Sequence, residues 1–228
     1  MPNNTSCHVV VRGNKTDIET IIKKHFDDKT LDFNSIIPMP EALKGTVEGS
    51  VRSRGEDLMR NGERARSYIM RRAAEKDITV PDGIDVNQLS HGDMLALALD
   101  VEPEIVFEGL DALRCLEEYG ARSWYDWSID NWGTKWGAYY GEYETTHSEA
   151  GTSKLDIHFC TAWSPASPVI CTLSEMYPDM EFEHHFLDEG GEFAGTEIYA
   201  NGQLVSNTDH DWVWFAESHF GCEFSDEE

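Results

Sequence analysis

The order of strand-like and helix-like segments constrains the fold of this chain more than any other feature. A β-branched strand over residues 7–12 is followed by a helix that Thr16 or Asp17 can cap, with an apolar stripe at Ile18, Ile21, Ile22 and Phe26. Alternating strands over 138–147 and 154–163 precede a second helix, entered through Pro165 and Pro168, and a strand over 180–187. With residues 41–120 set aside, the order is strand, helix, strand, strand, helix, strand. This order predicts an α+β fold with a ferredoxin-like antiparallel sheet and helices on one face.

The remaining segments predict three regions. The ferredoxin-like sheet domain comprises residues 1–40 and 121–207, including the tryptophan-rich stretch 124–137 and a hairpin of 193–199 with 203–205. Residues 41–120 form a helical insertion after the first strand–helix unit, with helices over 56–77, 90–100 and 103–119. Residues 208–228 form an aromatic and acidic C-terminal tail, whose aromatic part we expect to pack on the body.

Four short stretches carry a family resemblance. They are LDFNSIIPMP at 31–40, the NWGTKW core within 127–137, TAWSP at 161–165 and FAG at 193–195. In combination they resemble the YubB-type ferredoxin-like proteins carried by phages and plasmids, whereas residues 45–120 match no family by their motifs. The resemblance implies the ferredoxin-like fold and an origin on a mobile element. It implies no activity, because this family is largely uncharacterised.

Charge is divided unevenly along the chain. Residues 1–76 hold 14 Lys and Arg against 11 Asp and Glu, whereas residues 77–228 hold 4 against 32, and the whole chain has a net charge of −25. Such a surface repels nucleic acid and membranes, attracts basic protein surfaces and accelerates encounters with them. We therefore expect a basic protein partner, with no direct nucleic-acid or membrane binding.

The leading hypothesis joins this charge to the resemblance. It describes a phage- or plasmid-encoded protein that binds and inhibits a basic, nucleic-acid-handling host defence protein of the restriction or CRISPR type. Its carboxylates would mimic nucleic acid by occupying arginine and lysine sites that otherwise hold phosphates. The candidate partner-binding carboxylates, on or near one strand, are Glu181, Glu183, Asp188, Glu189, Glu192 and Glu197.

An alternative hypothesis is a nucleotide- or small-ligand-binding protein that uses the segment from Trp132 to Trp136. The indoles of Trp132 and Trp136 could stack on a ring while Lys135 holds a phosphate. The structural interpretation of the same residues is a set of core aromatics covered by the lysine stem.

Catalytic and metal-binding patterns do not indicate an enzyme. No G-x-S-x-G, H-E-x-x-H, Walker or G-x-G-x-x-G pattern occurs in a plausible setting, and we expect no cofactor. His184 and His185 lie beside acidic residues, as does His210, and these are metal-ligand chemistries. Neighbouring residues on a strand point to opposite faces, so His184 and His185 cannot bind one ion together. We therefore predict no metal site.

The arginine-rich helix predicted over 56–77 has two interpretations. It could dock on the acidic body of its own chain or of a second copy, which would make a homodimer through the stretch from Arg60 to Arg72. Otherwise its arginines form a solvated helix face.

A third hypothesis is a structural acidic protein adapted to salt, although adaptation would not explain a slightly basic first third. The chain starts without a basic region followed by an apolar one, and no stretch approaches 18 apolar residues. Its 5 cysteines are widely spaced. These features favour a protein of the host cytoplasm with free thiols.

Overall fold

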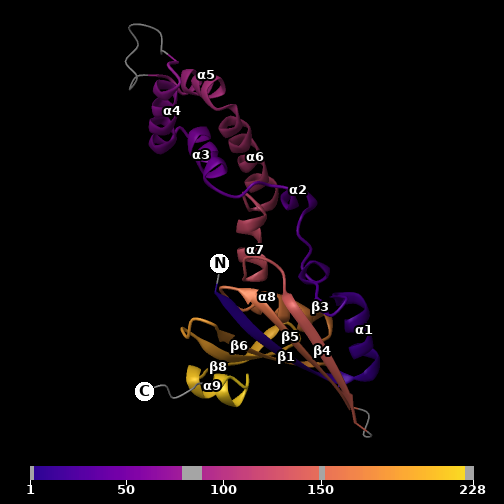
Figure 1. Cartoon of the computed structure of the whole chain (residues 1–228). Coiled ribbons are helices and arrows are strands. Elements are labelled where there is room, and N and C mark those ends of the chain that lie inside the picture. Colours follow the sequence, from indigo (N-terminus) through magenta and orange to yellow (C-terminus); the bar gives the residue numbers. More distant parts are fainter. Residues whose placement is uncertain (1–2, 79–88, 149–151, 224–228) are drawn as a thin grey trace, which may run out of the picture. The chain divides into compact units, whose positions relative to one another are not determined.

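The chain folds into two units in a computed structural model that describes residues 3–78, 89–148 and 152–223 (Figure 1). The sheet unit consists of Met1–Pro38 and Ser128–Glu228, and the helical unit consists of Met39–Trp127. Residues 121–127, expected in the sheet domain, group with the helices, and residues 208–223 of the expected tail belong to the sheet unit.

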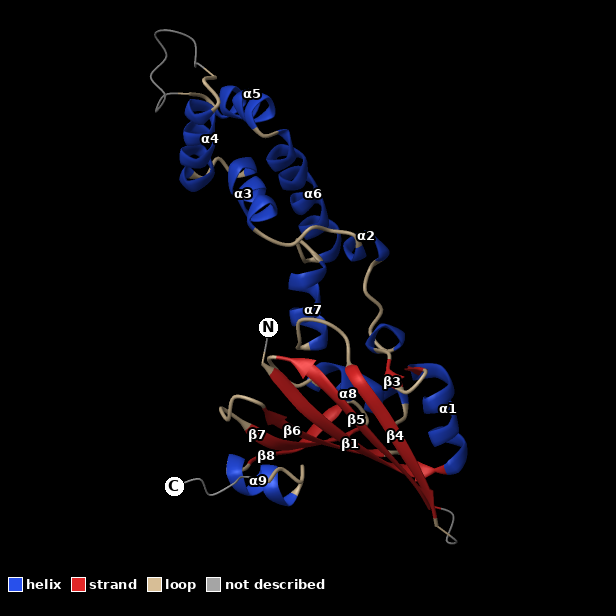
Figure 2. Cartoon of the chain, in the orientation of Figure 1, coloured by secondary structure: helices blue, strands red, loops and turns tan. Residues whose placement is uncertain are grey.

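One antiparallel sheet of 6 strands forms the sheet unit (Figure 2). Its spatial order is β4 (Tyr139–His147), β5 (Thr152–Ala162), β1 (Asn4–Asn14), β6 (Glu181–Asp188), β7 (Ala194–Ala200) and β8 (Gln203–Asp209). Helix α1 (Lys15–His25) follows β1, and helix α8 (Ser167–Met176) joins β5 to β6. The chain order β1-α1-β4-β5-α8-β6 is the predicted ferredoxin-like order, and the β7–β8 hairpin extends the sheet.

The alternation of buried side chains along β1 shows which face of the sheet the helices cover. Cys7, Val9 and Val11 are buried on one face, with Ile18 and Ile21 of α1 also buried. Contacts of α1 with β1 and β5, and of α8 with β6 and β7, place both helices on this face. Removing this apolar surface from water is the main stabilisation of the sheet unit.

Short elements follow α1 and β8 in the sheet unit. After α1 the chain forms a ribbon of β2 (Phe26–Asp27) and β3 (Thr30–Leu31) and then the 3-10 helix η1 (Phe33–Ser35). Helix α9 (Trp212–Ser218) packs Phe215 and Ala216 against Leu187 and Ala194, so the prediction that the aromatic tail packs back is confirmed.

The helical unit contains α2 (Glu41–Lys44), α3 (Ser50–Met59), α4 (Glu63–Glu75), α5 (His91–Val101) and α6 (Pro103–Tyr119). Its core includes Leu58, Ile69, Met94 and Ile105. Helix α7 (Trp124–Trp132) runs across the boundary between the two units.

Three local predictions are wrong. The helix expected over 56–77 is two helices, because the chain turns at Asn61, whose φ is 59°, and Gly62. Trp124–Trp132 is a helix rather than part of the sheet. Helix α1 is capped by Asn14, whose side chain accepts a hydrogen bond from the Asp17 N–H, and not by Thr16 or Asp17.

The 5 cysteines are free thiols. Within the described ranges, no helix combines the length and the apolar character needed to cross a bilayer.

Candidate functional site: the open face of the sheet

The face of the sheet opposite α1 and α8 is called the open face here, because among the described residues α9 is the one helix that covers part of it. Its central row places His8 of β1 between His158 of β5 and His185 of β6. The next row places Val10 between Asp156 of β5 and Glu183 of β6. Antiparallel register therefore brings residues from distant parts of the chain into cross-strand contact.

Carboxylates gather on this face. Glu142 and Glu144 of β4 lie opposite His158 and Asp156, and both are exposed. On β6, Glu181 and Glu183 lie opposite Arg12 and Val10 of β1. The acidic set of the open face is thus Glu142, Glu144, Asp156, Glu181 and Glu183.

Two cations share the face with these acids. Arg12 donates to Glu183 at 2.7 Å and to Glu181 at 3.2 Å, and Lys154 contacts Asp156 at 2.9 Å. Burial alone would raise the pKa of Asp156, but hydrogen bonds from Lys154 and His8 lower it below its ordinary value. Asp156 is therefore a charged carboxylate at neutral pH.

The six carboxylates predicted as one binding surface do not form one. Glu181 and Glu183 lie on the open face, whereas Glu189 and Glu192 follow the end of β6. Asp188 is buried on the helix-covered side, opposite Thr5, and its side chain accepts the Glu192 N–H. Period-two alternation separates these acids, because residues an odd number apart on a strand face opposite ways.

Glu197, the sixth predicted carboxylate, belongs to a polar cluster under α8. It accepts hydrogen bonds from Ser167 at 2.7 Å and Tyr199 at 2.8 Å, and His184 Nδ1 lies 3.4 Å away. Burial alone would raise the pKa of Glu197, but His184, Ser167 and Tyr199 favour the carboxylate, and the net effect is a lowered pKa. Glu197 is placed to hold the fold rather than to meet a partner.

The predicted ligand-binding residues have separate structural roles. Trp132 is buried, packs edge-on against Phe33 and donates its Nε1–H to the Ile37 carbonyl at 2.9 Å. The Lys135 ammonium lies 5.1 Å from the Trp136 ring centre and 4.7 Å from that of Trp163. Both separations are within cation–π range, so Lys135 contacts indoles of its own chain. This arrangement agrees better with the structural interpretation than with a ligand platform.

Most arginines of the helical unit pair with acids of the same unit. Arg52 is buried and contacts Glu108 at 2.6 Å and Asp111 at 2.8 Å. The other pairs join Arg60 and Arg122 to Glu56, Arg122 to Asp126, Arg72 to Glu75 and Glu102, and Arg114 to Asp111 and Glu118. These contacts neutralise acids within the helical unit and give no support to docking on the sheet unit.

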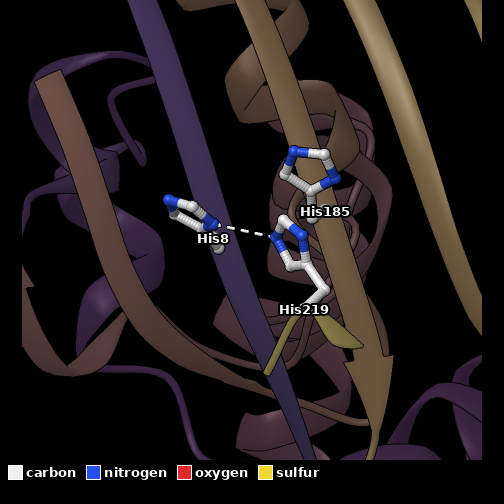
Figure 3. A group of neighbouring side chains, drawn as sticks. All are labelled: His8, His185 and His219. Carbon is white, nitrogen blue, oxygen red and sulfur yellow. Dashed lines mark hydrogen bonds between the residues drawn. The ribbon is translucent and has the colours of Figure 1, made fainter. Parts of the chain in front are cut away.

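A histidine cluster occupies the centre of the open face (Figure 3). His8 Nδ1 and His219 Nε2 are 2.9 Å apart, and the ring centres of His185 and His219 are 4.0 Å apart. His158 stacks on His8 from the other side, with ring centres 4.1 Å apart. His219 follows α9, which folds back over the sheet, so the cluster combines β1, β5, β6 and the segment after α9.

The surroundings keep the imidazoles of His8, His185 and His219 neutral. Burial, reinforced by the neighbouring histidines, lowers the pKa of His185 to about 3. Burial also lowers the pKa of His8 and of His219. Neutral imidazoles expose an unprotonated nitrogen that can accept a hydrogen bond or bind a metal.

Sequence reasoning missed this cluster. It considered His184 and His185 as neighbours and correctly separated them, but it did not bring His8 or His219 to His185. The register of β1 against β6 makes that connection. Repeated histidines at 8, 158, 185 and 219 were the available signal.

The strand order and the helical insertion define the class of protein. The chain has an α+β, ferredoxin-like antiparallel sheet with a helical insertion after the first β-α unit, as predicted. Residues 135–224 match the family described as the ferredoxin-like domain in Api92-like protein. Residues 135–224 are therefore similar to this domain, and the predicted resemblance to YubB-type ferredoxin-like proteins is confirmed.

Two known proteins show how far the similarity extends along the chain. The uncharacterised protein YubB of Escherichia coli strain K12 is 32% identical over 87 residues, which cover 38% of this chain and 57% of YubB. The chain thus spans little more than half the length of that relative. A crystal structure of the protein api92 from Yersinia pseudotuberculosis aligns with a TM-score of 0.44 and 11% identity, over 92% of this chain and 98% of that one.

Proposed function

We propose that this protein binds a basic, nucleic-acid-handling protein through the acidic open face of its sheet. The observation that carries the proposal is the charge of the sheet unit. Its sequence holds 25 Asp and Glu against 7 Lys and Arg, while the helical unit holds 18 against 11. Because most arginines of the helical unit are engaged by acids of that unit, the sheet unit keeps its negative charge.

The mechanism is electrostatic competition. Alternate residues along a strand are about 7 Å apart, and β4 and β6, which are separated by β5 and β1, lie roughly 14 Å apart. A sheet fixes these spacings without help from flexible loops, so the acids of β4 and β6 present ordered acceptors to arginine and lysine. Charged acceptors bind guanidinium groups strongly and in bidentate geometry, as phosphates do. A cationic surface that binds nucleic acid would therefore also bind this face.

The finer proposal concerns the partner. The resemblance to proteins of phages and plasmids supports a host defence protein of the restriction or CRISPR type, which the open face would inhibit by mimicking nucleic acid. A mobile element gains from blocking a protein whose basic channel holds DNA or RNA. The carboxylates proposed for the contact are Glu142, Glu144, Glu181 and Glu183, of which the last two were expected from the sequence.

The test compares two variants of equal charge. One carries Glu142→Gln, Glu144→Gln and Glu181→Gln on the open face, and the matched control carries Asp100→Asn, Glu104→Gln and Glu117→Gln, exposed acids of the helical unit. Full-length protein is used to capture partners from Escherichia coli lysate at low salt. Captured basic proteins are then purified, and their affinities for both variants are measured over a range of salt concentrations.

We expect the open-face variant to bind a nucleic-acid-handling partner roughly 10-fold more weakly than the control at low salt, since exposed charge pairs contribute about 0.2 to 1 kcal/mol each. Affinity for the native protein should fall steeply with salt, and the partner's own DNA or RNA should compete. Equal binding by the two variants, or affinity indifferent to salt, would refute the proposal.

A further inference from the structure

We propose that His8, His185 and His219 form a binding site for one divalent transition-metal ion, with Zn²⁺ as the best fit. Among the described residues, these three offer one ring nitrogen each, and the three nitrogens all lie within 4.8 Å of one another. They come from β1, β6 and the segment after α9 (Figure 3). Imidazole nitrogen suits Zn²⁺, Cu²⁺ and Ni²⁺ better than it suits Mg²⁺ or Ca²⁺.

The distances are close to those of a metal site. Nitrogens bound to zinc at 2.0–2.1 Å in a tetrahedral arrangement are about 3.3 Å apart. His8 Nδ1 and His219 Nε2 are 2.9 Å apart, so these two must separate by only a few tenths of an ångström. His185 must approach by at most about 1.5 Å, which a rotation of its side chain supplies.

The hydrogen bonds around His8 fix its free nitrogen. A carboxylate only accepts, so the 3.1 Å contact between His8 Nε2 and Asp156 Oδ1 requires that Nε2 carry the proton. Neutral His8 then presents an unprotonated Nδ1 toward His219. Asp156 is held in turn by Lys154 at 2.9 Å. A carboxylate that orients a metal-binding imidazole through its other nitrogen is the usual outer-shell partner of zinc ligands.

His185 is oriented by a second chain of hydrogen bonds. Its Nδ1 lies 2.9 Å from Thr196 Oγ1, and the same hydroxyl lies 2.9 Å from His210 Nε2. If Nδ1 donates to Thr196 and the hydroxyl donates to His210, then Nε2 of His185 carries the free lone pair. His219 supplies its Nε2 by shifting its proton to Nδ1, so binding of the ion to three neutral imidazoles releases no proton.

The fourth position of the ion has a candidate neighbour. Glu183 Oε1 lies 3.5 Å from His185 Nε2, while its other oxygen accepts from Arg12 at 2.7 Å. Three protein nitrogens and one water, with a carboxylate beside them, form a common zinc arrangement. Because His219 follows α9, an ion held here would also fasten α9 to the strands that carry His8 and His185.

The experiment measures binding of Co²⁺ and Zn²⁺ to the full-length protein in excess Mg²⁺, which occupies nonspecific carboxylate sites. We expect one Zn²⁺ or Co²⁺ per chain, with the visible absorption of tetrahedral Co²⁺. His219→Ala should weaken binding by more than about 100-fold, and Asp156→Asn by about 10-fold or more, as removal of an outer-shell partner does. Protection of the α9 segment from proteolysis by Zn²⁺ should be lost in His219→Ala.

Two controls keep the outcome decisive. His147→Ala removes an exposed histidine of β4 outside the cluster and should bind Zn²⁺ as the native protein does. His8→Gln provides a second ligand variant in case His219→Ala loosens α9, and circular dichroism verifies that each variant is folded. Absence of stoichiometric binding, or equal affinity of folded His8→Gln, His219→Ala and native protein, would overturn the site.

Discussion

Replacing Arg52 with methionine tests whether the arginines of the helical unit are internal structural charges. Arg52 is 3% exposed, and its guanidinium donates to four partners, including Cys115 Sγ at 3.5 Å. It donates to the Arg122 carbonyl at 2.7 Å, to Glu108 at 2.6 Å and to Asp111 at 2.8 Å. Methionine retains most of the apolar packing of the arginine stem but none of these hydrogen bonds. Arg52→Met therefore isolates the contribution of the charged group.

The expected loss of folding stability depends on the two carboxylates that Arg52→Met leaves without their guanidinium partner. Removing one partner of a fully buried ion pair costs about 3 to 5 kcal/mol, because the other charge stays buried. Here the side chains of Glu108 and Asp111 are 27% and 38% exposed, so water can solvate them after the change. We therefore expect a loss of about 2 to 3 kcal/mol, somewhat below that range. In a unit of this size, the melting temperature should fall by roughly 10 to 20 °C.

The assay is thermal unfolding followed by far-ultraviolet circular dichroism, which reports mainly on the helices. Arg60→Met is the matched control, because Arg60 pairs with Glu56 on the surface and its side chain is 56% exposed. An exposed pair of this kind contributes less than about 0.5 kcal/mol. Equal melting temperatures for the two variants would show that the helical unit does not depend on its internal ion pairs, and the charge argument for the sheet unit would lose its basis.

Three further predictions concern packing, pH and salt. Gly55→Ala should destabilise the helical unit by about 1 to 3 kcal/mol, because its added Cβ would lie 2.5 Å from the Gly109 nitrogen; Gly45→Ala, in open space, should be neutral in the same urea titration. The lowered pKa of Glu197 means that its stabilisation is complete above the ordinary Glu pKa and disappears as pH falls through the folded value. Melting temperatures should thus separate native protein from Glu197→Gln at neutral pH and converge in acid, and a gap that is constant with pH would contradict this. Added NaCl should raise the melting temperature of a protein already folded at low salt by screening its −25 charge; folding only in molar salt would favour the salt-adapted structural hypothesis instead.

The strands and most helices could be predicted because their patterns are local. Period-two alternation located the core strands, and Pro103 and Gly120 marked both ends of α6. The break between α3 and α4 was missed because good helix formers surround Asn61 and Gly62 on both sides. Helix α7 was missed because it is rich in tryptophan, a residue that is enriched in strands. Burial of Trp127 and Trp132 in the folded protein outweighs this preference.

The candidate site was less predictable because register is not a local property. Alternation could place Glu181 and Glu183 on one face and Asp188 on the other, but it could not say which strand adjoins them. Pairing of β4 with β5 brings Glu142 and Glu144 onto the same face, and return of the chain through α9 brings His219 there. Tertiary contacts alone therefore assemble both the acidic set and the histidine cluster.

The two proposals share one face, and their coupling has a definite sign. The histidine row is adjacent to the row of Asp156 and Glu183, so an ion at His8 would lie within about one Debye length, roughly 8 Å at physiological ionic strength, of these carboxylates. Its two positive charges would reduce the attraction of the face for a cationic protein while strengthening the order of the strands and α9. Linkage is reciprocal, so a basic partner would lower the affinity for Zn²⁺ by the same factor that Zn²⁺ lowers the affinity for the partner. A lower affinity for the partner in the presence of Zn²⁺ would show that the two sites are coupled as expected for one shared face, whereas fully independent binding would separate the metal site from the partner surface.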